Sequence, residues 1–152
     1  MRRYALVVLT GVLLVVGLLQ KDEIVAATKK TWKLPDGRTI SYADHVPPYE
    51  SRWYRIYLST PCSLGMDKEE LVFTYLPARK LAGKLAEYYA NPRPLRKLAT
   101  ARLDDGDEAY LYGDRIYIGR RCSSGHLHNR TQTYDCKDGA TANLILNVLA
   151  VP

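Results

Sequence analysis

The sequence predicts an α+β domain: a small antiparallel β-sheet with one packed helix, preceded by an apolar N-terminal signal or anchor helix. Three observations predict this fold. Short segments of aromatic and β-branched residues alternate with turns rich in Gly, Pro and Asp. The segment from residue 77 to 90 has apolar residues at helical spacing. Residues 4–19 form an almost purely apolar run behind Arg2 and Arg3.

The N-terminal segment can be interpreted in two ways. A basic pair followed by an apolar run is the layout of a secretion signal. The run is about 16 residues long, and because a membrane span needs roughly 20, its length favours a cleaved signal peptide. Charged residues at 21–23 separate the run from Val25 and Ala27, the small residues at which a signal could be cleaved. Because cleavage sites lie close behind the apolar run, this separation favours a retained anchor. Residues 1–27 are therefore predicted to be a signal peptide or a membrane anchor.

Both interpretations place residues 28–152 outside the cytoplasm, because Arg2 and Arg3 stay on the cytoplasmic side. The domain would be secreted, periplasmic or anchored to the membrane. It is long enough for one hydrophobic core, and no sequence repeat is evident. It carries 19 basic and 14 acidic residues. This moderate excess is compatible with an anionic partner but does not identify one.

The first half of the domain is predicted to be β-structure. Residues 32–42 alternate in polarity around a Pro-Asp-Gly turn and predict a hairpin. Residues 45–49 contain two prolines and predict a loop. Aromatic and β-branched residues at 52–59 and an apolar run at 71–75 predict two further strands, with a loop at residues 60–65 between them.

The helix and the second half follow. Pro77 suits a first helical turn, Leu81, Leu85 and Tyr88 share one face, and prolines at 92 and 94 end the helix. Residues 98–103 predict a strand, and 109–112 and 115–118 predict a hairpin around Gly113. The segment 122–138 is polar and predicted to be irregular, and the apolar run 144–151 is predicted to be a buried strand.

The three cysteines are Cys62, Cys122 and Cys136. Export predicts a disulfide between two of them, and Cys122 with Cys136 closes the shortest loop, which would contribute roughly 3 kcal/mol. The alternatives are a pair involving Cys62 and no disulfide. His126 and His128 lie inside the same segment, so Cys122, His126, His128 and Cys136 together form a candidate metal site. Their spacing matches no common zinc motif.

The sequence carries no nucleophile elbow, EF-hand loop or phosphate-binding glycine loop. We therefore expect a non-enzymatic domain without a cofactor. The alternative is a small secreted hydrolase or a metal-binding protein that uses the Cys122–Cys136 segment. His45, His126 and His128 are the histidines available to such an enzyme.

Six basic residues form a candidate binding patch on the helix and the loop after it: Arg79, Lys80, Lys84, Arg93, Arg96 and Lys97. Twelve tyrosines accompany them in the chain, and tyrosine suits binding surfaces as well as half-buried sheets. Basic and aromatic residues together can bind nucleic acid, but an exported domain is not expected to meet it. We expect the partner to be a protein or a cell-envelope component, or this chain to act as an accessory subunit. Residues 4–19 would contact the membrane if they are not cleaved.

Overall fold

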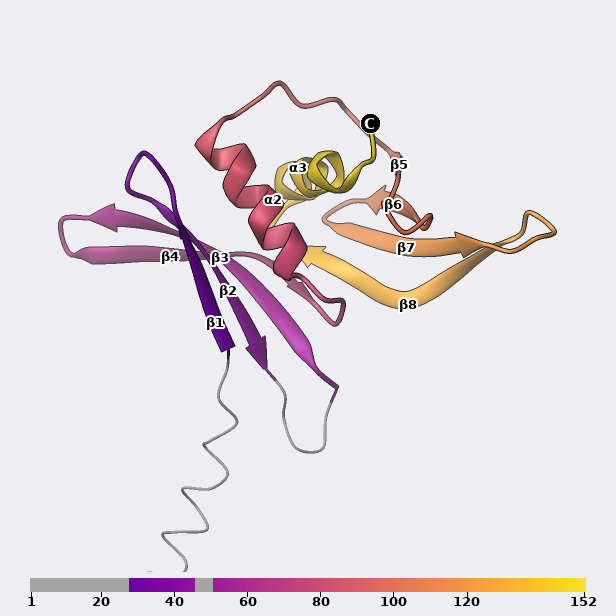
Figure 1. Ribbon diagram of the computed structural model, residues 1–152, viewed down its shortest axis with the longest axis horizontal. Helices are drawn as coiled ribbons and strands as arrows, with labels where there is room; N and C mark the ends of the chain where they lie inside the picture. The colour runs from indigo at the N-terminus through magenta and orange to yellow at the C-terminus, as the bar shows by residue number, and fades with distance from the viewer. Residues whose placement is uncertain (1–27, 46–50) are drawn as a thin grey trace, which may run out of the picture.

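The computed structural model describes residues 28–45 and 51–152 (Figure 1). The predicted N-terminal helix and most of the predicted loop at 45–49 lie outside these residues. The described part is a small antiparallel sheet of eight strands with helices packed on it. The predicted antiparallel sheet is confirmed, and the domain is mostly β.

The same series of elements occurs twice along the chain. The first half contains β1 (Thr28–Lys33), β2 (Thr39–His45), β3 (Trp53–Cys62), β4 (Gly65–Thr74) and helix α2 (Arg79–Ala90). The second half contains β5 (Thr100–Arg102), β6 (Glu108–Tyr112), β7 (Arg115–Arg121), β8 (Leu127–Cys136) and helix α3 (Gly139–Leu149). Each half is thus a four-strand meander followed by a helix, although the sequence shows no repeat.

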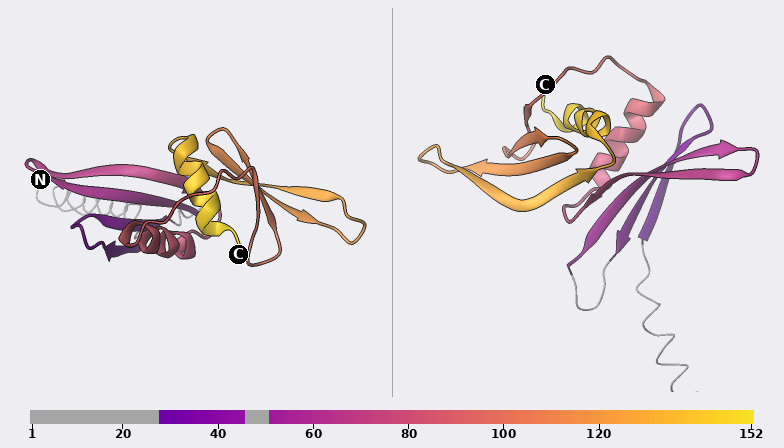
Figure 2. Two further views of the ribbon diagram at one scale, coloured as in Figure 1. Left: turned by 90° about the horizontal axis from the view of Figure 1, so that it is seen from above. Right: turned by 180° about the vertical axis from the view of Figure 1, so that it is seen from behind.

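The two meanders meet where β4 lies beside β8, giving the strand order β1-β2-β3-β4-β8-β7-β6-β5. Residues 72–74 of β4 pair antiparallel with residues 134–136 of β8. Figures 1 and 2 show the long hairpins β3–β4 and β7–β8 extending in opposite directions, with the two helices between them. The short junction is therefore the centre of one continuous sheet.

Two predicted hairpins are confirmed, and glycine explains their turns. Gly37 has φ of 87° in the β1–β2 turn, and Gly113 has φ of 63° in the β6–β7 turn. Residues with a Cβ rarely adopt this conformation. In the first turn the Asp36 side chain also accepts a hydrogen bond from the Arg38 amide at 3.0 Å, which favours the turn locally.

Both helices pack on the same face of the sheet and contact each other. Helix α2 lies against β1 and β2, whereas α3 lies against β5 to β8. Leu81 and Leu85 are buried, as the predicted helix face requires. The largest fully buried side chains are Ile40, Ile56, Leu81, Leu85, Ile116, Ile145, Leu146, Val72, Thr74 and Asp107.

The C-terminal apolar run is a helix, and the predicted buried strand is wrong. Asp138 caps α3 by accepting a hydrogen bond from the Thr141 amide at 2.7 Å. Ile145 and Leu146 are fully buried, because this helix is covered by the sheet and by α2. A fully buried run of this length has no polar period, so its pattern alone cannot separate a strand from a helix.

Two predicted irregular segments are also β-structure. The segment 122–138 contains β8, and residues 60–65 form the ends and turn of the β3–β4 hairpin. Polar residues occupy these strands because they extend away from the core, where few apolar partners exist. Within residues 28–45 and 51–152, neither helix is long and apolar enough to cross a lipid bilayer.

Candidate functional site

The structure does not bring the predicted cysteine pair together, and Cys62, Cys122 and Cys136 all have free thiols. Cys122 lies in the turn of the β7–β8 hairpin, whereas Cys136 is the last residue of β8. Strand residues rise roughly 3.3 Å each, so the intervening strand separates the two thiols by on the order of 25 Å. The segment between Cys122 and Cys136 forms one strand of a long hairpin and does not close into a loop.

The turn of this hairpin nevertheless brings together a thiol, a hydroxyl and an imidazole. The hydroxyl of Ser124 lies 2.9 Å from Cys122 Sγ and 3.0 Å from His126 Nδ1. The hydrogen bond with Ser124, joined by one with His128, lowers the pKa of the Cys122 thiol to about 6. Burial instead raises the pKa of the Cys136 thiol to about 12. Of these two thiols, Cys122 is the one with the lowered pKa.

The four predicted metal ligands do not converge. His126 and His128 lie at the Cys122 end of the hairpin, and Cys136 lies at the far end. In the described part of the chain, no group of three or more His, Cys, Asp or Glu side chains is arranged to hold a metal ion. The hairpin turn therefore offers a thiol and imidazoles without the closed ligand set that zinc requires.

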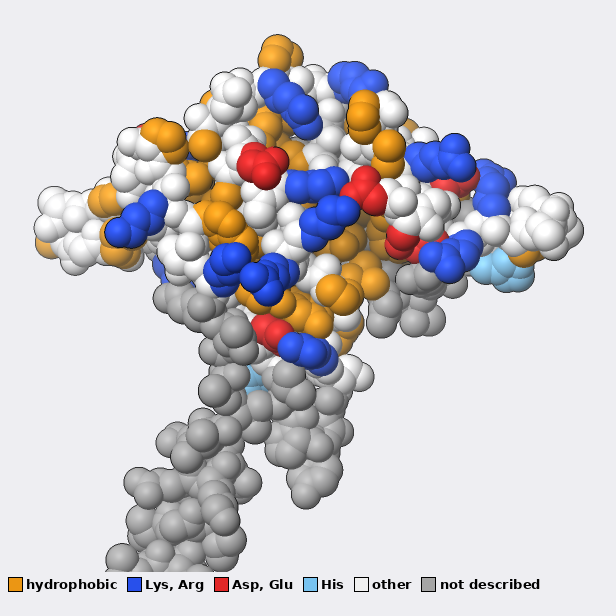
Figure 3. All heavy atoms as spheres, in the orientation of Figure 1, with side chains coloured by type: hydrophobic (Ala, Val, Ile, Leu, Met, Phe, Trp, Pro, Cys, Tyr) orange, Lys and Arg blue, Asp and Glu red, His pale blue; other side chains and the backbone are white. Residues whose placement is uncertain are grey.

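The predicted basic patch is dispersed along α2 and the connection that follows it. Lys80 forms an ion pair with Asp104, and Lys84 Nζ lies 3.5 Å from the same carboxylate. The hydrogen bond with Lys80 and the nearby Lys84 charge lower the pKa of Asp104. Figure 3 shows basic side chains interrupted by acidic ones over this region. This surface is therefore partly neutralised.

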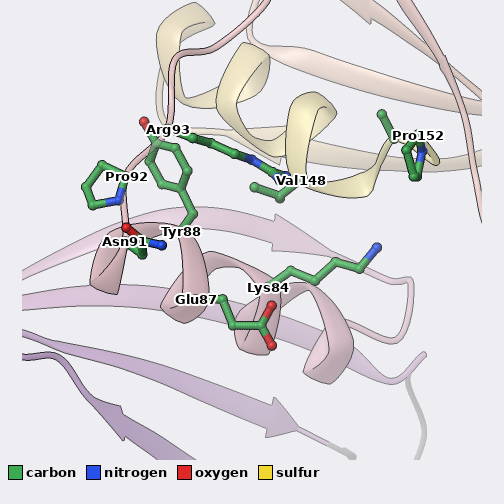
Figure 4. A pocket seen from close by; sticks show the side chains of 9 residues that line it. Lys84, Glu87, Tyr88, Asn91, Pro92, Arg93, Val148 and Pro152 are labelled. Atoms are coloured by element: carbon green, nitrogen blue, oxygen red, sulfur yellow. The ribbon is translucent and has the colours of Figure 1, made fainter.

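Two of the six basic residues, Lys84 and Arg93, border a groove between α2 and the end of α3. It has a volume of about 430 Å³, and its walls include Lys84, Glu87, Tyr88, Arg93 and Val148. Figure 4 shows the Arg93 side chain extending from the end of α2 toward Val148 on α3. Because the groove mixes both charges and lies at the C-terminal, electronegative end of α2, it does not select one class of ligand.

The opposite face of the sheet is a more extensive feature that sequence analysis missed. In the described part of the chain, both helices lie on one face, and we call the other the helix-free face. The strand register places seven aromatic residues on it: Trp53, Tyr57, Phe73, Tyr75, Tyr110, Tyr112 and Tyr117. They come from both meanders, so the aromatic surface crosses the junction.

One row of cross-strand neighbours shows how this face is built. Successive pairings join Arg55 to Phe73, Phe73 to Asp135, Asp135 to Arg115, and Arg115 to Tyr112. The Arg55 guanidinium lies 5.4 Å from the centre of the Phe73 ring. Arg115 Nε lies 3.1 Å from an Asp135 carboxylate oxygen. The row therefore alternates cationic and aromatic groups, with an acidic residue at the junction.

Ion pairs and hydrogen bonds order the face farther along the second meander. Arg121 Nε donates to Glu108 at 2.7 Å, and the Tyr110 hydroxyl donates to the same carboxylate at 2.5 Å. The hydrogen bond from Arg121 and then that from Tyr110 lower the pKa of Glu108. These contacts already hold the long side chains in fixed conformations. Binding a partner would therefore cost less side-chain conformational entropy.

A sequence signal for this face existed in the strand period of two. Trp53, Arg55 and Tyr57 alternate with the buried Tyr54, Ile56 and Leu58. The alternation assigns the first set to one face. It could not show that the equivalent face of the second meander continues it, because that depends on the pairing of β4 with β8.

Comparison of the chain with known protein families, with curated proteins and with solved structures finds no match.

Proposed function

We propose that this chain is a non-enzymatic exported or membrane-tethered domain that binds a protein or another cell-envelope component, or serves as an accessory subunit, through its helix-free face. The observation that carries the proposal is the aromatic and arginine surface that crosses both meanders. Aromatic residues and arginine are the residue types enriched at protein interfaces. The proposed location of the domain outside the cytoplasm rests on the apolar run at residues 4–19.

Three properties of the face support binding. Tyr112 is 79% exposed and Tyr75 is 47% exposed, so large rings are available to a partner. The Lys68 ammonium lies 3.9 Å from the centre of the Tyr57 ring. This contact adds a cationic group to the same surface. In the described residues, no second layer covers these side chains.

Site-specific photo-crosslinking tests this proposal in cells. A photoreactive phenylalanine derivative replaces Tyr57 or Tyr117, one from each meander. Tyr88 is the matched control, because it is also a half-buried tyrosine but lies on α2 in the groove. We expect discrete adducts from Tyr57 and Tyr117 and none from Tyr88. Adducts from Tyr88 alone would place the binding site on the helix side and refute the proposal.

The hairpin turn supports the alternative, a small hydrolase. The contact of Ser124 with both Cys122 and His126 is the arrangement in which a base can activate a nucleophile. The groove does not include these residues, because its lining comes from α2, α3 and their flanking segments. Cys122→Ser would abolish activity in a thiol hydrolase. We expect it to leave the crosslinks from Tyr57 and Tyr117 unchanged.

A further inference from the structure

The N-terminal segment joins the sheet at an end that carries a cluster of aromatic side chains. Thr28, the first residue of β1, pairs with Asp44 near the end of β2. His45, the last residue of β2, pairs with Trp53, the first residue of β3. The chain therefore passes from its apolar segment into the sheet beside His45 and Trp53.

Four rings on the helix-free face form a continuous series of contacts from this point, and we call them the tether-end cluster: His45, Trp53, Phe73 and Tyr75. The His45 and Trp53 ring centres lie 4.5 Å apart with their planes at 23°. Trp53 and Phe73 centres lie 5.9 Å apart, and Phe73 meets Tyr75 edge-on at 5.3 Å. The rings come from three strands and the residue that follows β4.

Two arginines lie at this end of the sheet. Arg55 extends over the rings of the cluster, whereas Arg52 lies on the opposite face, with its guanidinium 5.6 Å from the centre of the buried Tyr54 ring. The Arg55 guanidinium lies 4.8 Å from the Trp53 ring centre, and its side chain is 41% exposed. Its Nε lies 3.4 Å from a Glu70 carboxylate oxygen. Arg52 donates to Asp44 at 2.7 Å, and its side chain is 54% exposed. Both arginines therefore keep part of their hydrogen-bonding capacity toward solvent.

Rings with polar tips, together with a neighbouring arginine, are the chemistry of a membrane–water interface. Trp and Tyr are enriched at headgroup level, and arginine can cover apolar surface while its head contacts phosphate. A groove for a small ligand would need convergent walls, but this cluster lies on an open sheet. A broad, layered partner such as a bilayer surface suits that shape.

The length of the connecting chain agrees with this partner. Eight residues, 20–27, separate the apolar run from Thr28. A fully extended chain spans at most roughly 3.5 Å per residue, so these eight reach no farther than about 28 Å. If residues 4–19 enter a bilayer, this end of the sheet cannot move far from its surface.

We propose that the tether-end cluster lies at the headgroup level of the membrane that residues 4–19 enter, and that Arg55 binds lipid phosphate there, joined by Arg52 from the other face of the same end of the sheet. This inference rests on the tethered form of the proposed function and specifies the partner of one end of the helix-free face. The lipid contact fixes the orientation of the domain. The end of the sheet that carries the tether-end cluster faces the bilayer, and the turns of the long β3–β4 and β7–β8 hairpins extend beside this end.

The two tryptophans provide an internal comparison. Trp53 belongs to the cluster, whereas Trp32 pairs with Ile40 on the helix side, where its ring lies beside Gly83 of α2. Ile40 is five residues before His45 in β2, which corresponds to roughly 17 Å along the strand. A bilayer at the tether end would therefore contact Trp53 and not Trp32.

The test uses the full chain in vesicles of phosphatidylcholine and phosphatidylglycerol, with part of the lipid brominated close to the headgroup. Flotation first measures attachment to the vesicles, and tryptophan fluorescence then measures quenching by bromine. We expect Trp32→Phe, which keeps Trp53, to lose about half of its emission, because an indole at headgroup level is within reach of bromine. We expect Trp53→Phe, which keeps Trp32, to lose little.

The outcomes separate the two proposals. Flotation with strong quenching of Trp53 and weak quenching of Trp32 supports the lipid contact. Flotation without quenching of Trp53, or with equal quenching of both tryptophans, overturns the lipid contact and leaves the tether. Failure to float overturns the lipid contact and the tethered form of the proposed function, and it leaves the exported form. If Trp32→Phe does not fold, the loss of quenching between the unmodified chain and Trp53→Phe gives the same comparison.

Discussion

Replacing Leu85 with Ala tests the assignment of the core and the register of α2. Leu85 is fully buried on the helix face that packs against the sheet. Leu→Ala at such a site removes buried methyl groups and leaves a cavity that neighbours fill only in part. We expect the free energy of unfolding to fall by about 3 kcal/mol, because the small gain in helix propensity from Leu to Ala cannot offset the loss.

Leu64→Ala is the matched control, since the same atoms are removed from a side chain that is 98% exposed in the β3–β4 turn. Its effect should stay within about 0.5 kcal/mol. Thermal unfolding followed by circular dichroism measures both variants, and the Leu85 variant should melt roughly 10 °C lower. A loss below about 1 kcal/mol for Leu85→Ala, or equal melting temperatures for the two variants, would refute the assignment of this face as core.

Two further predictions concern the cap of α3 and the hairpin thiol. Asp138→Ala should lower the free energy of unfolding by about 1 kcal/mol, measured in denaturant, whereas Asp138→Asn, which retains the acceptor, should not. The bond from Thr141 lowers the pKa of Asp138, so its stabilisation is complete above the unfolded-state pKa of about 4 and is lost as pH falls through the lower folded-state value. In a Cys62→Ser background, Cys122 should be alkylated half-maximally near its pKa of about 6. Ser124→Ala should move this midpoint upward, and a midpoint near about 8.5 in both proteins would contradict the lowered pKa.

The local elements of the fold were predictable where one short segment contains its own determinants. The Pro35-Asp36-Gly37 turn contains a glycine that adopts positive φ and an aspartate that bonds the following backbone. Apolar residues recur along helix α2 with a period of 3.6, and the face that they form is the one buried against the sheet. These features depend on neighbours within a few residues, so they are visible without the tertiary structure.

The elements that were missed depend on their surroundings. Helix α3 is apolar on most sides because the sheet and α2 both cover it, and its one local signal was the Asp138 cap. Strand β8 is polar because much of it extends beyond the core as one arm of a hairpin. A polar strand lacks the apolar alternation by which strands are recognised. Its pairing with β7 and β4 is a property of the whole sheet.

The candidate site depends on the tertiary structure in the same way. Short spacing in sequence suggested that Cys122 and Cys136 would meet, but an extended strand converts short spacing into distance. His126 and Ser124 meet because both lie in one tight turn. The helix-free face joins Arg55 with Arg115, which are far apart in the chain and become neighbours only through Phe73 and Asp135.

The duplicated arrangement explains why one face stays open while the other is fully packed. Each meander is followed by a helix that returns over the same face, so α2 and α3 meet above the junction of β4 and β8. That junction contains the pairing of only three residues from each strand, and an isolated contact of this size between two sheets would be weak. Packing of α2 against α3 must therefore help to hold the meanders in register. Because the aromatic surface crosses the same junction on the opposite face, a partner bound across it would stabilise the junction from the second side.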